Sequence, residues 1–509
     1  MGTRLPRRPP APASAPIPNL KANKPPLQAC CAAFLQQACV IQRLSAGCKE
    51  GGNIVIQKNK SYEAVIEDLT LEGSGLCRVD GFAVFVPMTA VGDRVRFKAV
   101  KVQKNVGYGI LEQVITPSPA RQPVDCPVFR QCGGCAFRHI RYEEELRLKG
   151  KAVQDAFQRL GGFALTPEPI IGCDAQEHYR NKAQYPLGTD KDGRPTAGFY
   201  ARRSHRLVKA DDCLLQDEMF GPVVRTVLGL MERYKVSAYD ETTGKGLLRH
   251  LFLRKGAKSG ELMVCLVSTS RKVPFLEEFV QALTAAFPEI VSVMLNINAD
   301  KTNVILGKHS ILLYGKDGID DTLLDVQLSI PAAAFYQVNS PQAETLYRLA
   351  YEYAGFTGKE RLLDLYCGIG SIGLGAYSQV KKLIGVEVVA EAVASAQKNA
   401  RRNGMEAEFL CADAGEAAKA LADRGETPDV VIIDPPRKGC SAEVLESILR
   451  MAPKKVVMIS CNPATAARDA KMLCEKGYRL ERYRGVDLFP RTGHVECAAL
   501  LTRRGKTDD

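Results

Sequence analysis

The sequence predicts a multidomain protein in which a small β-rich unit and a mixed α/β region precede a doubly wound α/β domain. The first observation is length, because 509 residues are roughly three times the ~150 residues of an average domain. The second is a change in pattern, from short glycine-punctuated segments before residue 117 to regular strand–helix alternation after residue 331. Such alternation gives a mainly parallel sheet with helices on both faces.

Composition and charge narrow the function classes before any motif is considered. Hydrophobic residues make up 46% and charged residues 25% of the chain, as in ordinary globular proteins. We find neither the roughly 18 consecutive apolar residues of a membrane span nor a signal peptide. The 17 cysteines are mostly scattered, which favours a reducing cytoplasm over a disulfide scaffold. The excess of 69 basic over 57 acidic side chains permits a nucleic-acid partner without establishing one.

Residues 1–53 are expected to form a disordered, basic, proline-rich extension. Eight of the 28 prolines fall within the first 26 positions, and the first 50 residues hold seven basic side chains and one acidic side chain. The segment also lacks the apolar periodicity from which a packed core is built.

Residues 54–116 are predicted to form a small β-barrel. Three segments are rich in β-branched residues or alternate between apolar and polar residues, and glycines separate them at turn spacing. These segments are residues 62–66, 82–86 and 94–102. Lys98, Lys101 and Lys104 lie on or near the last strands, where they form either a solvated edge or a surface that contacts phosphates.

The central region, residues 117–321, begins with a compact group of cysteines. Cys126, Cys132 and Cys135 are separated by five and two residues, a spacing typical of metal or iron–sulfur ligands. A fourth ligand has to come from elsewhere, and Cys173 and Cys213 are the candidates by position; zinc competes with an iron–sulfur cluster. A helix over 143–160 and strands over 262–267 and 292–297 are expected to follow.

The last region, residues 322–509, contains the strand–helix alternation. The expected parallel strands are residues 361–366, 382–388, 407–411, 429–433 and 455–460. Two further strands, 479–486 and 495–501, predict a late antiparallel addition to the sheet.

A glycine loop follows the first of these strands. Gly368, Gly370 and Gly373 satisfy the G-x-G-x-x-G pattern, and the acidic Glu387 ends the next strand. Glycines at this spacing allow a tight turn and close approach of the backbone to a ligand, while the acid binds ribose hydroxyls. The pattern predicts an adenosine-containing cofactor and leaves NAD, FAD and S-adenosylmethionine open.

Three further motifs lie next to strand ends: two at the carboxyl ends of strands, where ligands bind in such sheets, and one before the last strand. Asp434, in Asp-Pro-Pro-Arg, could accept hydrogen bonds from a planar base or cap a helix. Cys461, in Ser-Cys-Asn-Pro, is either a buried structural thiol or a nucleophile for an electron-poor ring carbon, its thiolate favoured by a helix N-terminus. Glu496, with His494, is either a general base or an exposed turn residue.

Taken together, these motifs resemble one family. Its motifs, in order, match Cys126/Cys132/Cys135, Gly198–Tyr200 through Asp212-Cys213, Phe335–Asn339, Leu365–Gly370, Asp434–Arg437, Ser460–Pro463 and Gly493–Glu496. The series is similar to the RNA uracil-5-methyltransferases, in particular the bacterial 23S ribosomal RNA branch with an N-terminal TRAM domain. The resemblance covers about residues 54–505.

The resemblance implies a complete assignment. Residues 54–116 would be an OB-like TRAM barrel, 117–321 a central RNA-binding domain with a 4Fe-4S cluster, and 322–509 a Rossmann-like S-adenosylmethionine domain. The cluster ligands would be Cys126, Cys132, Cys135 and Cys213, and the cofactor contacts Gln337, Tyr366, Glu387, Asp413 and Asp434. Cys461 would be the nucleophile and Glu496 the base. The partner would be ribosomal RNA, with a single-stranded or loop uridine flipped into the site of a monomeric enzyme.

Four alternatives stay open. A transfer-RNA uracil methyltransferase belongs to the same class. A radical enzyme with a TRAM domain and a cluster has C-x3-C-x2-C spacing, whereas the first gap here holds five residues. An NAD oxidoreductase gives no role to Cys461 or Glu496, and a non-catalytic TRAM-type RNA-binding iron–sulfur protein needs neither residue.

Overall fold

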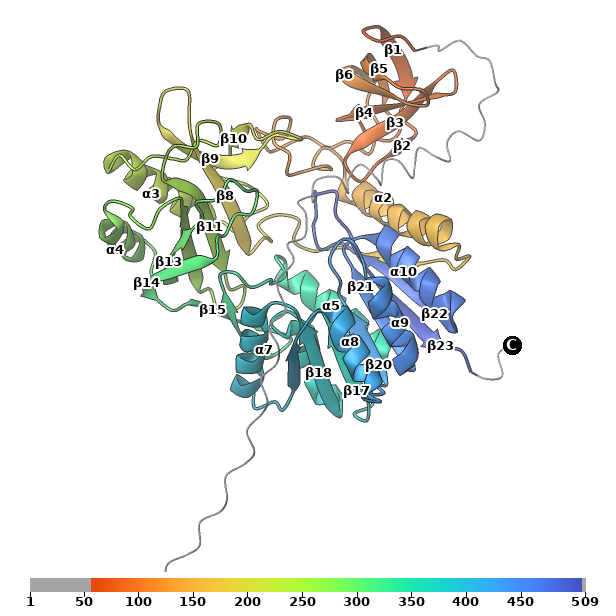
Figure 1. Ribbon diagram of the computed structural model, residues 1–509. Helices are drawn as coiled ribbons and strands as arrows, with labels where there is room; N and C mark the ends of the chain where they lie inside the picture. The colour runs from red at the N-terminus through yellow and green to blue at the C-terminus, as the bar shows by residue number, and fades with distance from the viewer. Residues whose placement is uncertain (1–55, 506–509) are drawn as a thin grey trace, which may run out of the picture.

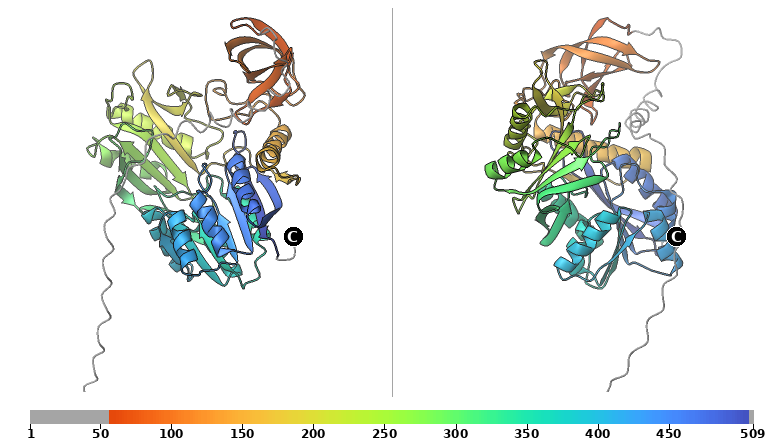
Figure 2. Two further views of the ribbon diagram at one scale, coloured as in Figure 1. Left: turned by 45° about the vertical axis from the view of Figure 1, so that its right-hand side comes forward. Right: turned by 60° about the vertical axis from the view of Figure 1, so that its left-hand side comes forward.

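The computed structural model describes residues 56–505, so the predicted extension over residues 1–53 lies outside the described residues. Figure 1 shows a small β unit above one end of α2 (Tyr142–Asp155), a central α/β lobe, and a C-terminal lobe built on a large sheet. The two further views in Figure 2 show the central and C-terminal lobes lying side by side.

The first unit is a curved sheet of six strands in the order β1-β5-β6-β4-β3-β2. Its strands are β1 (Ser61–Val65), β2 (Asp68–Leu69), β3 (Ser74–Val79), β4 (Phe82–Pro87), β5 (Arg94–Val102) and β6 (Gly107–Thr116). In β5 buried Val95 and Phe97 alternate with exposed basic residues, because successive side chains of a strand point to opposite faces. The sheet therefore encloses a small core of its own.

The central lobe is a seven-stranded sheet in the order β10-β9-β8-β11-β12-β13-β14. Its strands are β8 (Lys182–Thr189), β9 (Pro195–Tyr200), β10 (Leu207–Lys209), β11 (Leu248–Lys255), β12 (Leu262–Ser268), β13 (Ile290–Ile297) and β14 (His309–Gly315). The helices α3 (Phe220–Arg233) and α4 (Leu276–Ala286) pack on it. In α3 the buried residues Val223, Val227 and Met231 recur every four positions and form the apolar stripe that faces the sheet.

The C-terminal lobe follows a hairpin of β15 (Gly318–Leu323) and β16 (Val326–Pro331). Its sheet has the order β19-β18-β17-β20-β21-β23-β22-β7. The strands are β17 (Arg361–Leu365), β18 (Lys382–Glu387), β19 (Glu408–Cys411), β20 (Val430–Ile433), β21 (Lys455–Ser460), β22 (Tyr478–Val486) and β23 (Glu496–Arg503). The first five are parallel and β23 is antiparallel to β21, which confirms the predicted doubly wound sheet with a late antiparallel addition.

Helices cover both faces of this sheet, and each face has its own hydrophobic core. They are α5 (Ser340–Ala354), α6 (Ser371–Gly375), η2 (Tyr377–Gln379), α7 (Ala390–Arg402), α8 (Ala414–Asp423), α9 (Ala442–Met451) and α10 (Pro463–Glu475). The core that contains the hairpin includes residues of α5 and α7, and the opposite core includes residues of α8, α9 and α10.

One strand comes from an unexpected place. The strand β7 (Glu168–Ile171) lies within the region drawn as 117–321, yet it pairs in parallel with β22 at the edge of the C-terminal sheet. The predicted helix over 143–160 is α2, continued as the π-helical turn η1 (Ala156–Gly161). Phe157 of this turn is buried and stacks on Tyr483 of β22, so the preceding region is packed into the C-terminal lobe. The domain boundaries stay a prediction.

Within residues 56–505 no helix is long and apolar enough to cross a membrane.

Candidate active site

The glycine loop leaves the sheet at the carboxyl end of β17. Tyr366, Gly368 and Gly370 all adopt positive φ angles of +67°, +57° and +86°. A Cβ built on Gly368 would meet no atom within 4 Å, so the space above its backbone is open. The N–H of Gly373 donates to Asp364 at 2.9 Å, which fixes the far side of the loop. The loop thus presents bare backbone to a ligand, as the pattern predicts.

Glu387, at the tip of β18, is tied to this loop. One carboxylate oxygen accepts from the N–H of Gly368 at 3.1 Å, and the other accepts from the N–H groups of Val388 and Val389 at 2.9 Å each. The acidic group predicted to bind ribose hydroxyls therefore lies beside the glycine loop in a fixed orientation.

Asp413 follows the next strand and has a local structural role. Its carboxylate accepts from the N–H of Gly415 at 2.8 Å and caps α8. The carboxylate also acts on Tyr366: burial, then Cys440 and Asp413, raise the pKa of the Tyr366 phenol.

Gln337 lies between β16 and α5 and is buried. Its backbone carbonyl accepts from the side chain of Asn181 at 2.9 Å, which joins the central lobe to this segment. Its side chain faces the hydroxyl of Tyr347, whose pKa is raised by burial and by the nearby Asp434. Gln337 and Asp434 thus flank the same buried tyrosine.

Two acidic side chains with raised pKa values lie on neighbouring strands: Asp364 is in β17, bonded to the glycine loop, and Asp434 follows β20. Burial raises the pKa of Asp364 to about 8, with Asp434 and Glu387 adding to the shift. Burial alone raises the pKa of Asp434 to about 7. Sequence reasoning did not single out Asp364; its signal was an acidic residue inside an otherwise apolar strand.

Strand register brings Cys461 and Glu496 together. Ser460, the last residue of β21, pairs with Cys497 of the antiparallel β23. The residue after Ser460 is Cys461 and the residue before Cys497 is Glu496, so these two residues are opposite one another. Their electrostatic contact agrees, since Glu496 is among the groups that raise the pKa of the Cys461 thiol.

The carboxyl group of Glu496 is buried, 3% exposed, and no described side chain pairs with it in a hydrogen bond or ion pair. Burial, followed by the charge of Asp434, raises its pKa to about 8, while Arg437 acts in the opposite direction. A group with this pKa exchanges its proton near neutral pH, as a general base must.

The expectation that the site favours the Cys461 thiolate is wrong for the protein without ligands. Burial, then Glu496, raises the pKa of this thiol to about 11, and Arg437 only partly offsets the effect. The N-terminus of α10, which follows Cys461, does little to stabilise the thiolate. Pro463, its first residue, has no N–H to offer, and the cap residue Asn462 accepts from Ala464 through its own side chain.

His494 is the neighbour of Glu496 that the sequence suggested. An Arg437 nitrogen lies 3.4 Å from both of its ring nitrogens. Partial burial, then the positive charges of Arg437 and Arg180, lower the pKa of His494 to about 4, although the residue as a whole is exposed. The imidazole is therefore neutral at physiological pH.

The loop that carries His494 and Glu496 is held at its start by a buried ion network. Lys149 of α2 donates to Glu145 at 2.7 Å, to Asp487 at 2.8 Å and to the carbonyl of Phe489 at 3.0 Å. All three charged side chains are fully buried. Sequence reasoning missed this network; its only signal was the i, i+4 spacing of Glu145 and Lys149 in a predicted helix.

The middle of the same loop is fixed from two other directions. The carbonyl of Arg491, whose φ is +69°, accepts from the N–H groups of Ala136 and Phe137 at 2.8 and 3.0 Å. Gly493 packs so closely on the first unit that a Cβ there would lie 2.0 Å from the carbonyl oxygen of Leu71. The loop is thus enclosed between the β unit, the residues that follow Cys135, and α2.

The four predicted cluster cysteines lie near one another. Burial, then Cys213, raises the pKa of Cys135 to about 12, and Cys132 and Cys126 add to it. Cys173 lies elsewhere, with its sulfur 3.5 Å from the side-chain nitrogen of Asn339. Among the residues that the structure describes, no group of three or more His, Cys, Asp and Glu side chains is arranged to hold a metal ion.

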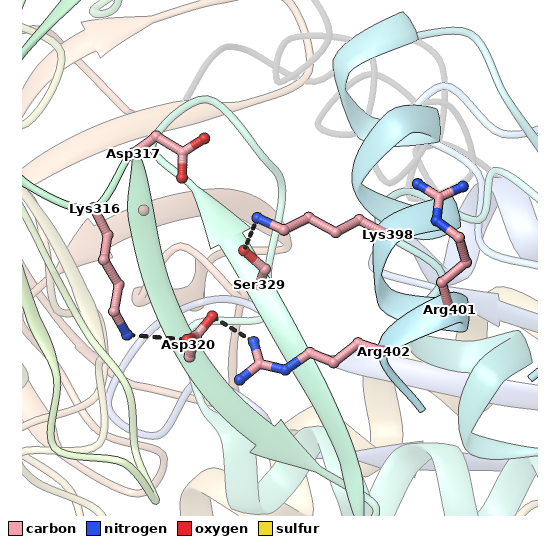
Figure 3. Close-up of a pocket in the computed structure, with 8 residues that line it drawn as sticks. Lys316, Asp317, Asp320, Ser329, Lys398, Arg401 and Arg402 are labelled. Atoms are coloured by element: carbon pink, nitrogen blue, oxygen red, sulfur yellow. Dashed lines mark hydrogen bonds and ion pairs between the residues drawn. The ribbon is translucent and has the colours of Figure 1, made fainter. Parts of the chain in front are cut away.

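A polar cavity of about 640 Å³ lies away from these residues, between the β15–β16 hairpin and α7 (Figure 3). Its cations are largely paired. Asp320 accepts from Lys316 at 3.0 Å and from Arg402 at 2.7 Å, and Lys398 donates to Ser329 at 3.2 Å. None of the residues predicted for the site lines this cavity.

The fold and the rim define a class, a Rossmann-like methyltransferase, and the comparisons with known proteins agree. A family model described as tRNA (uracil-5-)-methyltransferase matches residues 141–504. The chain therefore belongs to the tRNA (uracil-5-)-methyltransferase family and is an RNA methyltransferase.

Relatives match over nearly their whole length. The chain is 42% identical to an uncharacterized RNA methyltransferase of Halalkalibacterium halodurans over 448 residues, which are 88% of this chain and 98% of that protein. It is 40% identical to an uncharacterized RNA methyltransferase of Clostridium tetani over 454 residues, covering 89% and 98%. Among solved structures, the tRNA (uracil-54, C5)-methyltransferase of Pyrococcus abyssi in complex with S-adenosyl-L-homocysteine matches with a TM-score of 0.70 and 27% identity, covering 86% of this chain and 99% of that chain.

Proposed function

We propose that this protein transfers a methyl group to C5 of uracil in 23S ribosomal RNA through a covalent adduct between Cys461 and C6 of the base. The observation that carries the proposal is the register between β21 and β23, which sets Cys461 opposite Glu496, with Asp434 acting on both electrostatically. A nucleophile beside a base is what addition to a ring followed by elimination requires.

S-adenosylmethionine is the proposed methyl donor. The related Pyrococcus abyssi enzyme holds the corresponding product, S-adenosyl-L-homocysteine. In this chain the open space above Gly368 and the fixed carboxylate of Glu387 fit an adenosine, because such acids bind ribose hydroxyls. The proposed contacts are Gln337, Tyr366, Glu387, Asp413 and Asp434.

The chemistry explains why these residue types occur. C5 of uracil is too weak a nucleophile to accept a methyl group unaided. Addition of the Cys461 sulfur to C6 places electron density on C5, which then takes the methyl group from the sulfonium. The ionised carboxylate of Glu496 removes the remaining proton from C5, and cleavage of the bond between C6 and sulfur leaves 5-methyluracil in the RNA and regenerates the thiolate.

Arg437 has a place in this scheme. Among the charged groups that act on the Cys461 sulfur, Arg437 favours the ionised form, whereas Glu496 and Asp434 oppose it. We propose that Arg437 stabilises the Cys461 thiolate once RNA is bound.

The choice of RNA rests on sequence resemblance, and transfer RNA is the second candidate. The matching family model and the Pyrococcus abyssi structure both carry tRNA in their descriptions, which favours that alternative. Mapping 5-methyluridine in ribosomal and transfer RNA from cells without this protein distinguishes the two. Loss of a 5-methyluridine from 23S RNA supports the proposal, loss from tRNA supports the alternative, and no loss from either contradicts both.

We further propose that Cys126, Cys132, Cys135 and Cys213 bind a 4Fe-4S cluster in the central region. Four thiols that act electrostatically on one another form a suitable donor set, although their side chains do not form a closed metal site as they stand. The Gly134 N–H, 3.4 Å from the sulfur of Cys132, is a hydrogen-bond donor of the kind that surrounds such clusters.

Anaerobic purification followed by iron and sulfide analysis tests the cluster. Iron and labile sulfide are expected in equal amounts, and Cys213→Ser should lose most of both, because it removes one of the four ligands. Cys173→Ser is the matched control and should keep them, since its sulfur lies beside Asn339. Stoichiometric zinc without sulfide contradicts the iron–sulfur assignment.

The β unit is proposed to be a TRAM domain that binds RNA, and the enzyme to act as a monomer without an obligate protein partner. Lys98 and Lys101 support RNA binding, because both are exposed on β5 and neither forms an ion pair with a described carboxylate. Size-exclusion chromatography with light scattering tests the oligomeric state, for which one chain per particle is expected.

A further inference from the structure

Two cations, Arg180 and Lys182, lie at the start of β8, where the central lobe contacts the segment between β16 and α5. Between them in sequence, Asn181 donates at 2.9 Å each to the carbonyl of Gln337 and to the hydroxyl of Ser340. Asn181 therefore docks this part of the central lobe against the segment that holds a proposed cofactor contact. Arg180 and Lys182, on either side of Asn181 in sequence, therefore lie near this contact between the two lobes.

Neither of these cations has an anionic partner in the described residues. Arg180 makes no ion pair, and its buried Nε has no hydrogen-bond partner. Lys182 pairs across the sheet with Arg254, another cation, and burial together with Arg254 and Arg180 lowers the pKa of Lys182 to about 8. Gathering like charges away from water costs free energy, so the arrangement is at its most stable when an anion is bound.

The cavity in Figure 3 differs from this site, because two of its cations have an anionic partner. There Lys316 and Arg402 share the carboxylate of Asp320, so each of these two cations has an anionic partner within the protein. Beside Arg180 and Lys182 the neighbouring charge is positive. The missing anion has to come from a ligand.

The position of Arg180 indicates which ligand this is. Its guanidinium lies over the ring of Phe489, 5.9 Å from the centroid, and its charge acts on His494. Both residues belong to the loop that ends in Glu496, so Arg180 lies on the side of Glu496 from which we expect the reacting base to enter. A nucleotide flipped out of its stack brings its own phosphates to that entrance.

We propose that Arg180 and Lys182 form a binding site for an RNA phosphodiester next to the reacting uridine. The inference rests on the proposed function, because it takes RNA as the substrate of this cleft. Phosphate contacts position RNA without reading its sequence, and they supply free energy that offsets extrusion of the base. A carboxylate, such as that of the proposed methyl donor, is the competing anion, and the experiment separates the two.

The test uses the full-length protein and a synthetic RNA stem-loop around a uridine that the wild-type enzyme methylates. Lys182→Met should weaken RNA binding about tenfold and reduce the slope of log Kd against log salt by about one, because the variant binds one phosphate fewer. Lys191→Met, an exposed lysine in the turn after β8, is the charge-matched control and should change neither quantity. Lys182→Arg keeps the charge and should restore binding.

A second arm identifies the phosphate. Phosphates flanking the uridine are replaced one at a time by uncharged methylphosphonates. At one position the wild type should lose about tenfold in affinity while Lys182→Met loses nothing further, because the variant no longer binds that phosphate. Unchanged affinity of Lys182→Met, equal losses at every position in both proteins, or a rise confined to the KM for S-adenosylmethionine overturns the phosphate site. A wild-type enzyme that methylates no uridine contradicts the proposed function instead.

Discussion

The loop between β22 and β23 has buried carboxyl groups at both ends, and the protein treats them in opposite ways. At its start, Asp487 is paired with Lys149 at 2.8 Å inside a network without solvent contact. At its end, Glu496 is equally enclosed but has no paired cation among the described residues, and its pKa rises to about 8. Burial alone therefore does not define the role of a charged group. Asp487, which is paired, holds the loop in place, whereas Glu496, which is unpaired, can exchange a proton.

The largest expected effect is at the unpaired end. Cys461→Ala removes the sulfur that adds to C6, so methyl transfer should fall on the order of 10⁴-fold or more. Binding of S-adenosylmethionine, measured by calorimetry, should change little, because Glu387 and the glycine loop are intact. Retained methyl transfer by Cys461→Ala would remove the thiol from the mechanism.

At the paired end the expected effect is on stability. Lys149→Met leaves buried Asp487 without its cation and Glu145 with only Arg491, at 3.7 Å, which should lower the free energy of unfolding by about 3–5 kcal/mol. Lys151→Met, two residues further along α2, is the matched control, because that lysine is 39% exposed and its ion pairs with Asp68 and Asp155 should be worth about 1 kcal/mol or less. Urea denaturation measures both, and equal losses would mean that the buried network does not hold the loop.

The unpaired carboxyl group should also make stability depend on pH. The pKa of Glu496 is raised from 4.5 to about 8, so between these values the folded protein keeps a proton that the unfolded chain has released. Stability from this group is therefore present at low pH and is lost as pH rises toward 8. Thermal unfolding of Glu496→Gln should lack this part of the decline, and identical pH profiles for the two proteins would place the titration elsewhere.

The smallest expected effect concerns the exposed lysines of the β unit. Changing Lys98 and Lys101 of β5 to Gln should reduce the slope of log Kd for RNA against log salt by about one for each phosphate that these lysines bind. The methylation rate at saturating RNA should stay unchanged, because both lysines are exposed on β5 and neither belongs to the residues proposed for catalysis or cofactor binding. An unchanged slope would identify these lysines as an ordinary solvated face of the β unit.

The parts of the fold that could be predicted from sequence are those that local patterns of apolar and polar residues encode. The parallel strands end within one or two residues of their expected positions, because apolar runs and intervening helices mark them. Cys461 and Glu496 were predicted for the same rim because each follows or precedes a recognisable strand. Their exact opposition needed the register between β21 and β23, which no local pattern encodes.

Other features depend on contacts across the chain. β7 has four residues and no periodicity, and its place beside β22 comes from the packing of α2 and η1. The bond from Lys149 to Asp487 joins residues 338 positions apart. The direction of the Cys461 pKa shift was predicted wrongly because burial and Glu496 outweigh the helix terminus, a balance that only the folded geometry reveals.

The most direct test of the central claim, that Cys461 adds to the base and Glu496 allows it to leave, uses Glu496→Gln with native RNA and S-adenosylmethionine. Addition and methyl transfer should proceed, but the proton on C5 should stay, so a methylated covalent protein–RNA complex should accumulate. Mass spectrometry of the digested complex should place the nucleotide on Cys461. Normal turnover by Glu496→Gln without a trapped complex would contradict the account and make His494 the next residue to test.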